Sequence, residues 1–324
     1  MDKKIRWGII GLGKIANKFA FDLQHTEDAV LQAVASRDIQ NARAFSRKFN
    51  ALSCYDSYEK LARDPDVDIV YVATPHTFHF PHTMLCLENG KAVLCEKPLG
   101  TTTVEVKAML EEAKSRKLFL MEGIWTRFIP ATVKLIELLE NNAIGEIQLV
   151  RADFGFKAGF DPEGRLFDKK LGGGSLLDIG IYPIYLSLLA LGLPRDIKVM
   201  VRMTETNVDS YCAMLFDYDN AAKAVLESSL EADTPTEAYL YGSRGMIKIH
   251  RRFHESQKIS LYQDGALTET FDLSYKGYGF TFEIEEVGNC LKSQKTESSS
   301  LPHRVSLDMI TLIDRVMGKM RSGA

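Results

Sequence analysis

The sequence predicts an α/β domain followed by an α+β domain, and three observations support this prediction. Residues 5–122 alternate short apolar runs with helical patterns, the order that builds a parallel sheet covered by helices. From Glu146 onward, period-two alternation and short turns dominate, which indicates a mostly antiparallel sheet. The chain has 324 residues, and single cores stop growing near roughly 250–300 residues. Because the composition also changes at Gly123, we predict two domains, 1–122 and 123–324.

The first predicted unit is a strand, a glycine turn, a helix and a second strand. Residues 5–10 form an apolar run, and Gly11-Leu12-Gly13-Lys14-Ile15-Ala16 follows it directly. A helical pattern then continues to about residue 25, and residues 31–35 form the next strand. This is the context of the dinucleotide-binding fingerprint, whose unit has about thirty residues. A glycine-rich turn in another α/β protein is the alternative.

Each residue of the fingerprint has a physical task. Gly11 permits the tight turn, Gly13 lets a pyrophosphate approach the backbone, and the small Ala16 lets helix and strand pack closely. Lys14 and Ile15 open the helix, whose N-terminal N–H groups favour phosphate. We therefore predict that these five residues bind a dinucleotide cofactor.

The second strand ends in Ser36-Arg37-Asp38. An NAD site usually has an acidic residue near this point to hold the ribose 2′-hydroxyl, whereas an arginine can pair with a 2′-phosphate. Ser36 and Arg37 therefore favour NADP as the cofactor. NAD is the alternative, with Asp38 as the ribose acceptor, and a plain polar turn is a third interpretation.

A strand at 69–73 leads into Thr74-Pro75-His76-Thr77-Phe78-His79. Ligands of open α/β sheets bind outside the carboxyl ends of the strands. We therefore expect Thr74, Pro75, His76 and His79 to contact the cofactor. A capping or packing role is the alternative for each histidine.

In the segment 92–99, an apolar run leads into an acid, an amine and a proline, Glu96-Lys97-Pro98. If it is a buried parallel strand, Lys97 lies where the chemistry takes place. Glu96 and Lys97 are both expected at the cofactor, and a structural or lysine-positioning role suits Glu96 better than direct catalysis. The bond before Pro98 is one that can be cis.

The remaining elements follow from periodicity and turn residues. The other predicted helices span 38–49, 57–64, 81–88, 101–115, 131–141, 175–191, 280–291 and 302–320. The other predicted strands span 119–122, 147–156, 198–203, 211–218, 221–231, 237–241, 245–250 and 258–262. Asp264-Gly265 predicts a hairpin turn.

A second group of polar residues lies in the helical insertion 175–191. Asp178 and Tyr182 are four residues apart and share a face on a continuous helix, although Pro183 could place a break near Gly180. Hydride transfer from an alcohol needs a base for the hydroxyl proton, and lysine or tyrosine can serve. The structural alternatives are a capping box from Ser175 to Asp178 and an ordinary buried tyrosine.

Composition argues against several classes of protein. The net charge is −3 and the pI is about 6.2, so no overall attraction to nucleic acid is expected. Five scattered cysteines, with no closely spaced pair, predict neither a metal site nor a disulfide framework. The apolar runs are too short to span a bilayer, and the start of the chain leads directly into a strand. We therefore expect a cytoplasmic protein with no membrane partner.

The segments GIIGLGKIA, ATPHTFH, LCEKPLG and GGGSLLDIGIYP together resemble the Gfo/Idh/MocA oxidoreductases. EGIWTRFIP and Tyr182 are most similar to the dimeric dihydrodiol dehydrogenase branch of that family. The resemblance implies a Rossmann domain followed by an α+β domain with a large, open, mostly antiparallel sheet. It also implies pairing through the exposed face of that sheet, as a homodimer or a dimer of dimers.

The resemblance also implies roles for individual residues. Lys97 matches the catalytic lysine of the family, and Tyr182 and Asp178 match its partner positions. Further matches in the substrate pocket or its surroundings are Trp125, Arg127 and Phe154.

Together, these observations predict an NADP-dependent oxidoreductase. It would transfer hydride between the nicotinamide and a small secondary alcohol, diol or sugar-like carbonyl substrate. Lys97 would donate a hydrogen bond to the reacting oxygen, Tyr182 would act as general acid/base, and Asp178 would orient Lys97 or the substrate hydroxyls. The alternatives are a lyase or glycosidase that uses bound NAD transiently, and a non-catalytic NAD(P)-binding sensor.

Overall fold

The computed structural model describes residues 4–322 and divides the chain into two compact units. The first unit consists of Met1–Phe128 and Lys276–Leu307, and the second of Ile129–Tyr275 and Asp308–Ala324. The chain therefore enters each unit twice, which differs from the single break expected near Gly123. Hydrogen bonds hold the second segment, Lys276–Leu307, in the first unit. The Asp22 carboxylate accepts them from the backbone N–H groups of Tyr278 and Phe280.

The first unit contains a six-stranded parallel sheet with the order β3-β2-β1-β4-β5-β6. Its strands are β1 Ile5–Ile10, β2 Ala29–Ala35, β3 Ser53–Tyr55, β4 Ile69–Val72, β5 Ala92–Glu96 and β6 Leu120–Gly123. This order reverses at β1, which marks a dinucleotide-binding crevice at the carboxyl ends of the strands. The predicted Rossmann domain is thus confirmed. The short, half-buried β3 lacks an apolar run, and the sequence did not reveal it.

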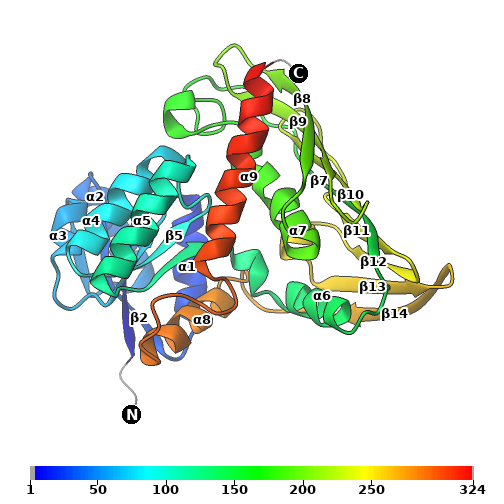
Figure 1. Cartoon of the computed structure of the whole chain (residues 1–324). Coiled ribbons are helices and arrows are strands. Elements are labelled where there is room, and N and C mark those ends of the chain that lie inside the picture. Colours follow the sequence, from blue (N-terminus) through cyan, green and yellow to red (C-terminus); the bar gives the residue numbers. More distant parts are fainter. Residues whose placement is uncertain (1–3, 323–324) are drawn as a thin grey trace. The chain divides into compact units, whose positions relative to one another are not determined.

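Helices cover this sheet, and the first unit ends with a returning helix (Figure 1). They are α1 Lys14–Leu23, α2 Ile39–Phe49, α3 Tyr58–Ala62, α4 His79–Glu88, α5 Thr103–Arg116 and α8 Thr281–Lys292, with short 3-10 turns η1 His76–Phe78 and η2 Trp125–Arg127. Helices α4 and α5 pack together, and α8 packs against α1. The closing helix α9 His303–Ser322 contributes residues to both units.

An aromatic cluster ties the returning segment into the core of the first unit. The rings of Phe19 and Tyr71 are stacked, with centroids 3.7 Å apart, and Trp7 packs against Phe19 at 5.4 Å. Phe280 approaches the same Phe19 ring edge-on at 5.9 Å. Helix α8 therefore completes the hydrophobic core formed around α1, β1 and β4.

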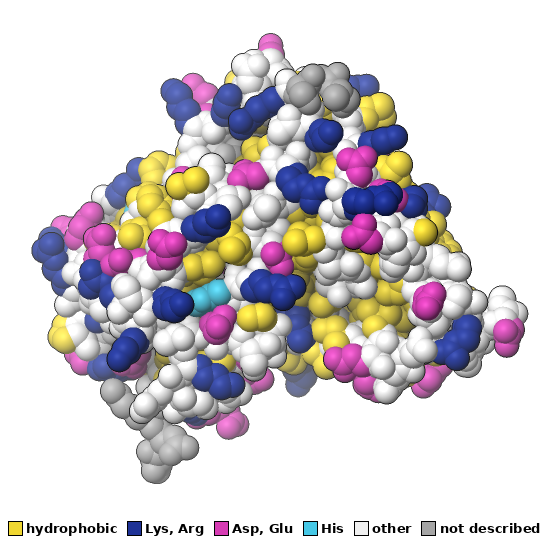
Figure 2. Space-filling view, viewed as in Figure 1, with side chains coloured by type: hydrophobic (Ala, Val, Ile, Leu, Met, Phe, Trp, Pro, Cys, Tyr) yellow, Lys and Arg dark blue, Asp and Glu magenta, His cyan; other side chains and the backbone are white. Residues whose placement is uncertain are grey.

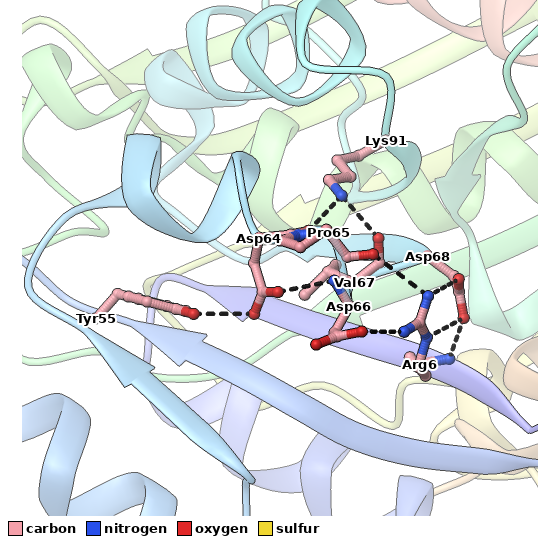
Figure 3. A network of polar contacts seen from close by, with 8 residues as sticks. All are labelled: Arg6, Tyr55, Asp64, Pro65, Asp66, Val67, Asp68 and Lys91. Atoms are coloured by element: carbon pink, nitrogen blue, oxygen red, sulfur yellow. Dashed lines mark hydrogen bonds and ion pairs between the residues drawn. The ribbon is translucent and has the colours of Figure 1, made fainter.

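A polar network lies at the amino ends of β4 and β5, the edge of the sheet opposite the carboxyl ends of the strands (Figure 3). The Arg6 guanidinium donates to both carboxylate oxygens of Asp68, at 3.0 and 2.8 Å. Buried Lys91 donates to the backbone carbonyls of Asp64 and Val67. These hydrogen bonds hold the loop before β4 against β1 and β5, away from the carboxyl ends of the strands.

The second unit contains an eight-stranded sheet with the order β14-β13-β12-β11-β7-β10-β9-β8. Its strands are β7 Ile147–Gly155, β8 Asp196–Met203, β9 Asp209–Asp217, β10 Lys223–Ser229, β11 Ala238–Gly242, β12 Gly245–Ile249, β13 Lys258–Gln263 and β14 Ala266–Asp272. Every neighbouring pair is antiparallel except β7 with β10. The predicted open, mostly antiparallel sheet is confirmed. Asp264 and Gly265 both have positive φ, which matches a type I′ hairpin turn between β13 and β14.

Helices α6 Pro130–Glu140 and α7 Ile181–Leu191 lie on one face of this sheet (Figure 1). On the other face, Leu215 and Val225 are directly opposite each other on β9 and β10, and each is 42% exposed. Met200 of β8 pairs with Ala213, two residues along β9 from Leu215, so it lies on the same face, and it is 67% exposed. This face therefore presents exposed apolar side chains that no helix of the described residues covers.

Two surface properties bear on possible partners. In the described part of the chain, the stretch Lys169–Leu191 is long and apolar enough to cross a membrane, but 83% of its most apolar window is buried inside the protein. It is therefore a core segment. On the face seen in Figure 2, acidic and basic side chains are interspersed, as the small net charge suggests.

Candidate active site

The glycine turn after β1 has the geometry that a pyrophosphate requires. Gly11 has a φ of +84°, and a Cβ there would lie 2.6 Å from the backbone of Ala73. A Cβ on Gly13 would meet no atom within 4 Å. Gly13 begins α1 without a side-chain cap, and the first turn, which includes Lys14 and Ile15, has no acidic residue. The N–H groups of this helix start are thus left for an anion, and the residues fit a dinucleotide cofactor.

At the end of β2, the side chain of Asp38 has a structural task. Asp38 Oδ1 accepts a hydrogen bond from the Gln40 N–H at 2.8 Å and caps α2. Ser36 Oγ in turn accepts from the Asp38 N–H at 3.2 Å. Arg37 lies between them and is exposed. The alternative in which Asp38 holds a ribose therefore competes with a helix cap.

The loop after β4 contains two histidines with different surroundings. His76 is buried, and its ring meets that of His79 edge-on at 5.7 Å. The Pro98 carbonyl lies 2.7 Å from His79 Nδ1, and the Thr74 carbonyl lies 2.7 Å from Nε2. Burial lowers the pKa of His79 to about 4, although both carbonyl contacts favour the charged ring.

Both ring nitrogens of His79 are thus used by the protein backbone. His79 connects the loop after β4 with the loop after β5, and its contact with the cofactor stays a prediction.

Lys97 directly follows β5, at the carboxyl edge of the sheet. The Tyr71 hydroxyl donates to Glu96 Oε1, and the Lys97 N–H donates to Glu96 Oε2 at 3.3 Å. Glu96 is thus held by the Tyr71 hydroxyl next to Lys97, and its contact with the cofactor stays a prediction. The peptide bond between Lys97 and Pro98 is cis.

A second buried carboxylate holds the same loop. Glu122 Oε1 accepts a hydrogen bond from the Leu99 N–H at 2.8 Å. Burial raises the pKa of Glu122 to about 7. The segment that carries Lys97 is thus fixed from β5, β6 and α4.

The tryptophan turn η2 is also held within the first unit. The ring of Trp125 stacks on Phe280, with centroids 5.1 Å apart. Arg127 Nε donates to the Ser300 carbonyl at 2.8 Å. Phe280 comes from the returning segment, and no local pattern in the sequence connects residues so far apart in the chain.

In the second unit, Asp209 shapes the segment that carries the predicted acid and tyrosine. Asp209 Oδ2 accepts from Ser175 Oγ at 2.6 Å and from the Leu176 N–H at 2.7 Å. Ser175 has helical backbone angles and makes no cap bond with its side chain. The suggested capping box from Ser175 to Asp178 is therefore wrong, because the buried Asp209 takes that role from another strand.

Asp178 lies in a π-helical turn, Leu176–Gly180, that passes directly into α7. This agrees with the possible break near Gly180, and such turns are frequent at functional sites. The Asp178 carboxylate forms a two-pronged ion pair with Arg165, at 2.8 and 3.3 Å. Arg165 lies in the irregular loop after β7, where no periodic pattern pointed to it.

Three rings cluster beside the start of α7. Phe154 of β7 and Tyr182 of α7 have ring centroids 5.7 Å apart. His254, from the short turn η5 Phe253–Glu255, stacks on Phe154 at 4.3 Å and lies 4.9 Å from Tyr182. Phe154, Tyr182 and His254 thus lie together in the second unit.

The predicted site residues form two groups. The first unit carries Gly11, Gly13, Lys14, Ile15, Ala16, Ser36, Arg37, Thr74, Pro75, His76, His79, Glu96, Lys97, Trp125 and Arg127, and the second carries Phe154, Asp178 and Tyr182. One group has the features of a nucleotide site. The other combines a paired carboxylate with a buried phenol. Together they define the class of NAD(P)-dependent oxidoreductases.

Comparison with known proteins identifies the family. Residues 5–124 match the model of the oxidoreductase family with an NAD-binding Rossmann fold, and residues 132–248 match the GFO/IDH/MocA C-terminal domain. The chain belongs to the Gfo/Idh/MocA family. It is an NAD(P)-dependent dehydrogenase or reductase that acts on CH–OH groups.

Individual relatives agree with this assignment. Trans-1,2-dihydrobenzene-1,2-diol dehydrogenase of Mus musculus is 36% identical over 307 residues, covering 92% of this chain and 91% of the mouse protein. The human enzyme of the same name is 35% identical and covers 96% of both chains. Among solved structures, a 3-ketoreductase from Actinomadura kijaniata in complex with NADP and TDP-benzene is 27% identical, with a TM-score of 0.87 and 98% of both chains covered. An aldose-aldose oxidoreductase from Caulobacter crescentus shares the fold, with 24% identity, 99% coverage of both chains and a TM-score of 0.91.

Proposed function

We propose that this protein uses NADP to interconvert a secondary alcohol, diol or sugar-like substrate and its carbonyl counterpart. The observation that best supports NADP is at the end of β2, where Arg37 is exposed and Asp38 is used as a helix cap. The names of the relatives point to diols, and the Actinomadura ketoreductase was solved with NADP. The bound nicotinamide would supply or accept the hydride.

The proposed chemistry assigns one task to each of three residues. Lys97 donates a hydrogen bond to the reacting oxygen and orders the proton relay. Tyr182 acts as general acid/base, directly or through Lys97. Asp178 orients Lys97 or the substrate hydroxyls, and its fixed ion pair with Arg165 suits that task.

The binding residues are part of the same proposal. The glycine turn with Lys14, Ile15 and Ala16 would bind the pyrophosphate, while Ser36 and Arg37 would bind the adenosine ribose. Around the reacting end, the residues proposed to contact the cofactor are Thr74, Pro75, His76, His79, Glu96 and Lys97. Substrate contacts are assigned to Trp125, Arg127, Phe154, Asp178 and Tyr182. His79 and Glu96 would also hold the loops of this site in place through their polar contacts.

We also propose a homodimer, or a dimer of dimers, that pairs through the helix-free face of the large sheet. The exposed side chains of Met200, Leu215 and Val225 on this face support the assignment, because an exposed apolar sheet face suits burial against a second copy. A cytoplasmic location is proposed as well, since all five cysteines are free thiols.

A turnover screen tests the function. Wild-type and Lys97→Met proteins are assayed on sugars, inositols, diols and dicarbonyls, with NAD(H) and NADP(H) in parallel. We expect wild-type turnover with NADP(H), and a loss of several orders of magnitude in Lys97→Met with nearly unchanged cofactor binding. Unchanged turnover in Lys97→Met contradicts the role of the lysine. Product formation with no net change in nicotinamide absorbance would indicate a transient redox lyase or glycosidase instead.

A further inference from the structure

A histidine outside the predicted site completes a polar and aromatic cluster at the carboxyl edge of the Rossmann sheet. His82 Nδ1 lies 3.0 Å from the Thr74 hydroxyl. The ring of Tyr58 meets that of His82 edge-on, with centroids 4.7 Å apart. Phe78 lies parallel to the same ring at 5.7 Å. His82 is thereby held in one orientation by groups from α3, η1 and the loop after β4.

The position of this cluster follows from the strand order. Strands β2 and β4 flank β1, where the order of the sheet reverses. Arg37 follows β2, and Thr74 follows β4. The contact between Tyr58 and His82 joins α3 and α4 on the same edge. In such folds the adenosine ribose lies beyond β2, and the pyrophosphate lies at the turn after β1.

The second ring nitrogen of His82, Nε2, points to an anionic ligand. Nδ1 is engaged with Thr74, whereas Nε2 has no hydrogen-bond partner among the residues that the structure describes. The ring is half-buried, so Nε2 can be reached from outside. An imidazole that keeps one nitrogen on the protein and gives the other to a phosphate is a charge-assisted donor once protonated.

The charges around His82 set its protonation. Burial lowers the pKa of His82, the negative charge of Glu59 opposes this effect, and the positive charge of Arg37 adds to it. Burial also raises the pKa of Tyr58, so the phenol beside His82 stays neutral. His79 is the remaining titratable neighbour, and burial lowers its pKa to about 4. His82 is therefore poised to take up a proton when a phosphate dianion comes close.

We propose that His82, together with Arg37, recognises the 2′-phosphate of NADP, and that proton uptake by His82 makes this recognition pH-dependent. The inference rests on the proposed preference for NADP. Arg37 would supply a permanent charge and His82 a conditional one. The enzyme would then discriminate NADP from NAD more strongly as the pH falls toward the pKa of His82.

Binding of cofactor fragments tests the proposed role of His82 without any turnover. Binding of 2′,5′-ADP and 5′-AMP is measured by calorimetry between about pH 5.5 and about pH 8.5, on either side of the usual histidine pKa. The proteins are wild type, His82→Gln, Arg37→Gln and the control His25→Gln, which removes an exposed histidine at the end of α1. Comparing variants at each pH cancels the titration of the phosphate itself.

At low pH, His82→Gln should weaken 2′,5′-ADP binding about tenfold, the effect of one charge-assisted hydrogen bond. Binding of 5′-AMP should stay within about twofold, which also shows that the variant is folded. Wild type should take up a proton on binding 2′,5′-ADP, measured from buffers of different ionisation enthalpy, and His82→Gln should not. The control should behave as wild type.

The outcomes distinguish a failure of the proposed role of His82 from a failure of the proposed NADP preference. If Arg37→Gln loses 2′,5′-ADP selectively but His82→Gln binds it as wild type does, the role of His82 is wrong and the NADP preference stands. If wild type binds 2′,5′-ADP no better than 5′-AMP, the NADP preference itself is wrong, and this inference falls with it. Equal loss of both fragments in His82→Gln would reduce His82 to a packing residue and also overturn the inference.

Discussion

Arg165 and Asp178 form a two-pronged ion pair in which Nη1 lies 2.8 Å from Oδ1 and Nη2 lies 3.3 Å from Oδ2. The carboxylate is buried in a π-helical turn, while the guanidinium comes from an exposed loop. Fork-to-fork pairs fix the plane of a carboxylate as well as its charge. Arg165 therefore helps to set the direction of the Asp178 carboxylate.

Arg165→Met should lower kcat/KM by about 10- to 100-fold, because a misdirected Asp178 no longer orients its partners. Arg165→Lys should recover only part of the loss, since a lysine cannot make the two-pronged contact. Steady-state kinetics with the best diol or carbonyl substrate from the screen provide the measurement. The control is Arg195→Met, which breaks an exposed ion pair with Asp217 in the same unit. Equal activity of Arg165→Met and the control would show that the ion pair is only structural.

Glu122 should make stability fall as the pH rises. Its pKa is about 4.5 when exposed and about 7 in the folded protein because of burial, so the folded state holds a proton that the unfolded state has lost between these values. Over about two pH units this amounts to up to about 2–3 kcal/mol. Glu122→Gln removes the titration and keeps a carbonyl acceptor for the Leu99 N–H.

Urea unfolding at about pH 5 and about pH 7 measures this effect. We expect the stability of Glu122→Gln relative to wild type to rise between the two pH values. Glu111→Gln, an exposed change on α5, serves as the control and should show no such trend. Parallel pH dependences of wild type and Glu122→Gln would mean that Glu122 is ionised in the folded protein at both values.

Gly174→Ala should disturb the start of the π-helical turn. Gly174 has a φ of +117°, and a Cβ there would lie 2.4 Å from Asp209 Oδ1. The strained backbone and the displaced carboxylate together should cost about 1–3 kcal/mol of the free energy of unfolding. Thermal unfolding and kcat are measured together, with Gly159→Ala as the control, since a Cβ on Gly159 meets nothing within 4 Å. A stable, fully active Gly174→Ala protein would show that Asp209 does not hold this segment.

The sequence revealed those parts of the site that depend on local rules. Gly11 follows a strand and precedes a helix, so its positive φ was foreseeable from the motif alone. Asp264 and Gly265 predicted their hairpin turn in the same way. Lys97 could be placed at a strand end because β5 is a continuous apolar run.

What the sequence could not reveal are contacts between residues far apart in the chain. Asp209 caps a turn that begins at Ser175, and this replaces the local capping box that the spacing suggested. His254 reaches Phe154 only because β7 and the segment after β12 belong to one unit. No periodicity encodes such pairs, since they depend on the register of the sheet and on where an irregular loop returns.

The proposed dimer can be tested on the helix-free sheet face without touching the site residues. Leu215 and Val225 are directly opposite on neighbouring strands, so a charge at Leu215 would be buried without a partner if a second copy covers this face. Leu215→Arg should therefore shift the protein from dimer to monomer in sedimentation equilibrium, while 5′-AMP still binds. The control is Val133→Arg, which places the same charge on an exposed apolar position of α6. If Leu215→Arg keeps the mass of the wild type at all protein concentrations, the two copies do not pair through this face.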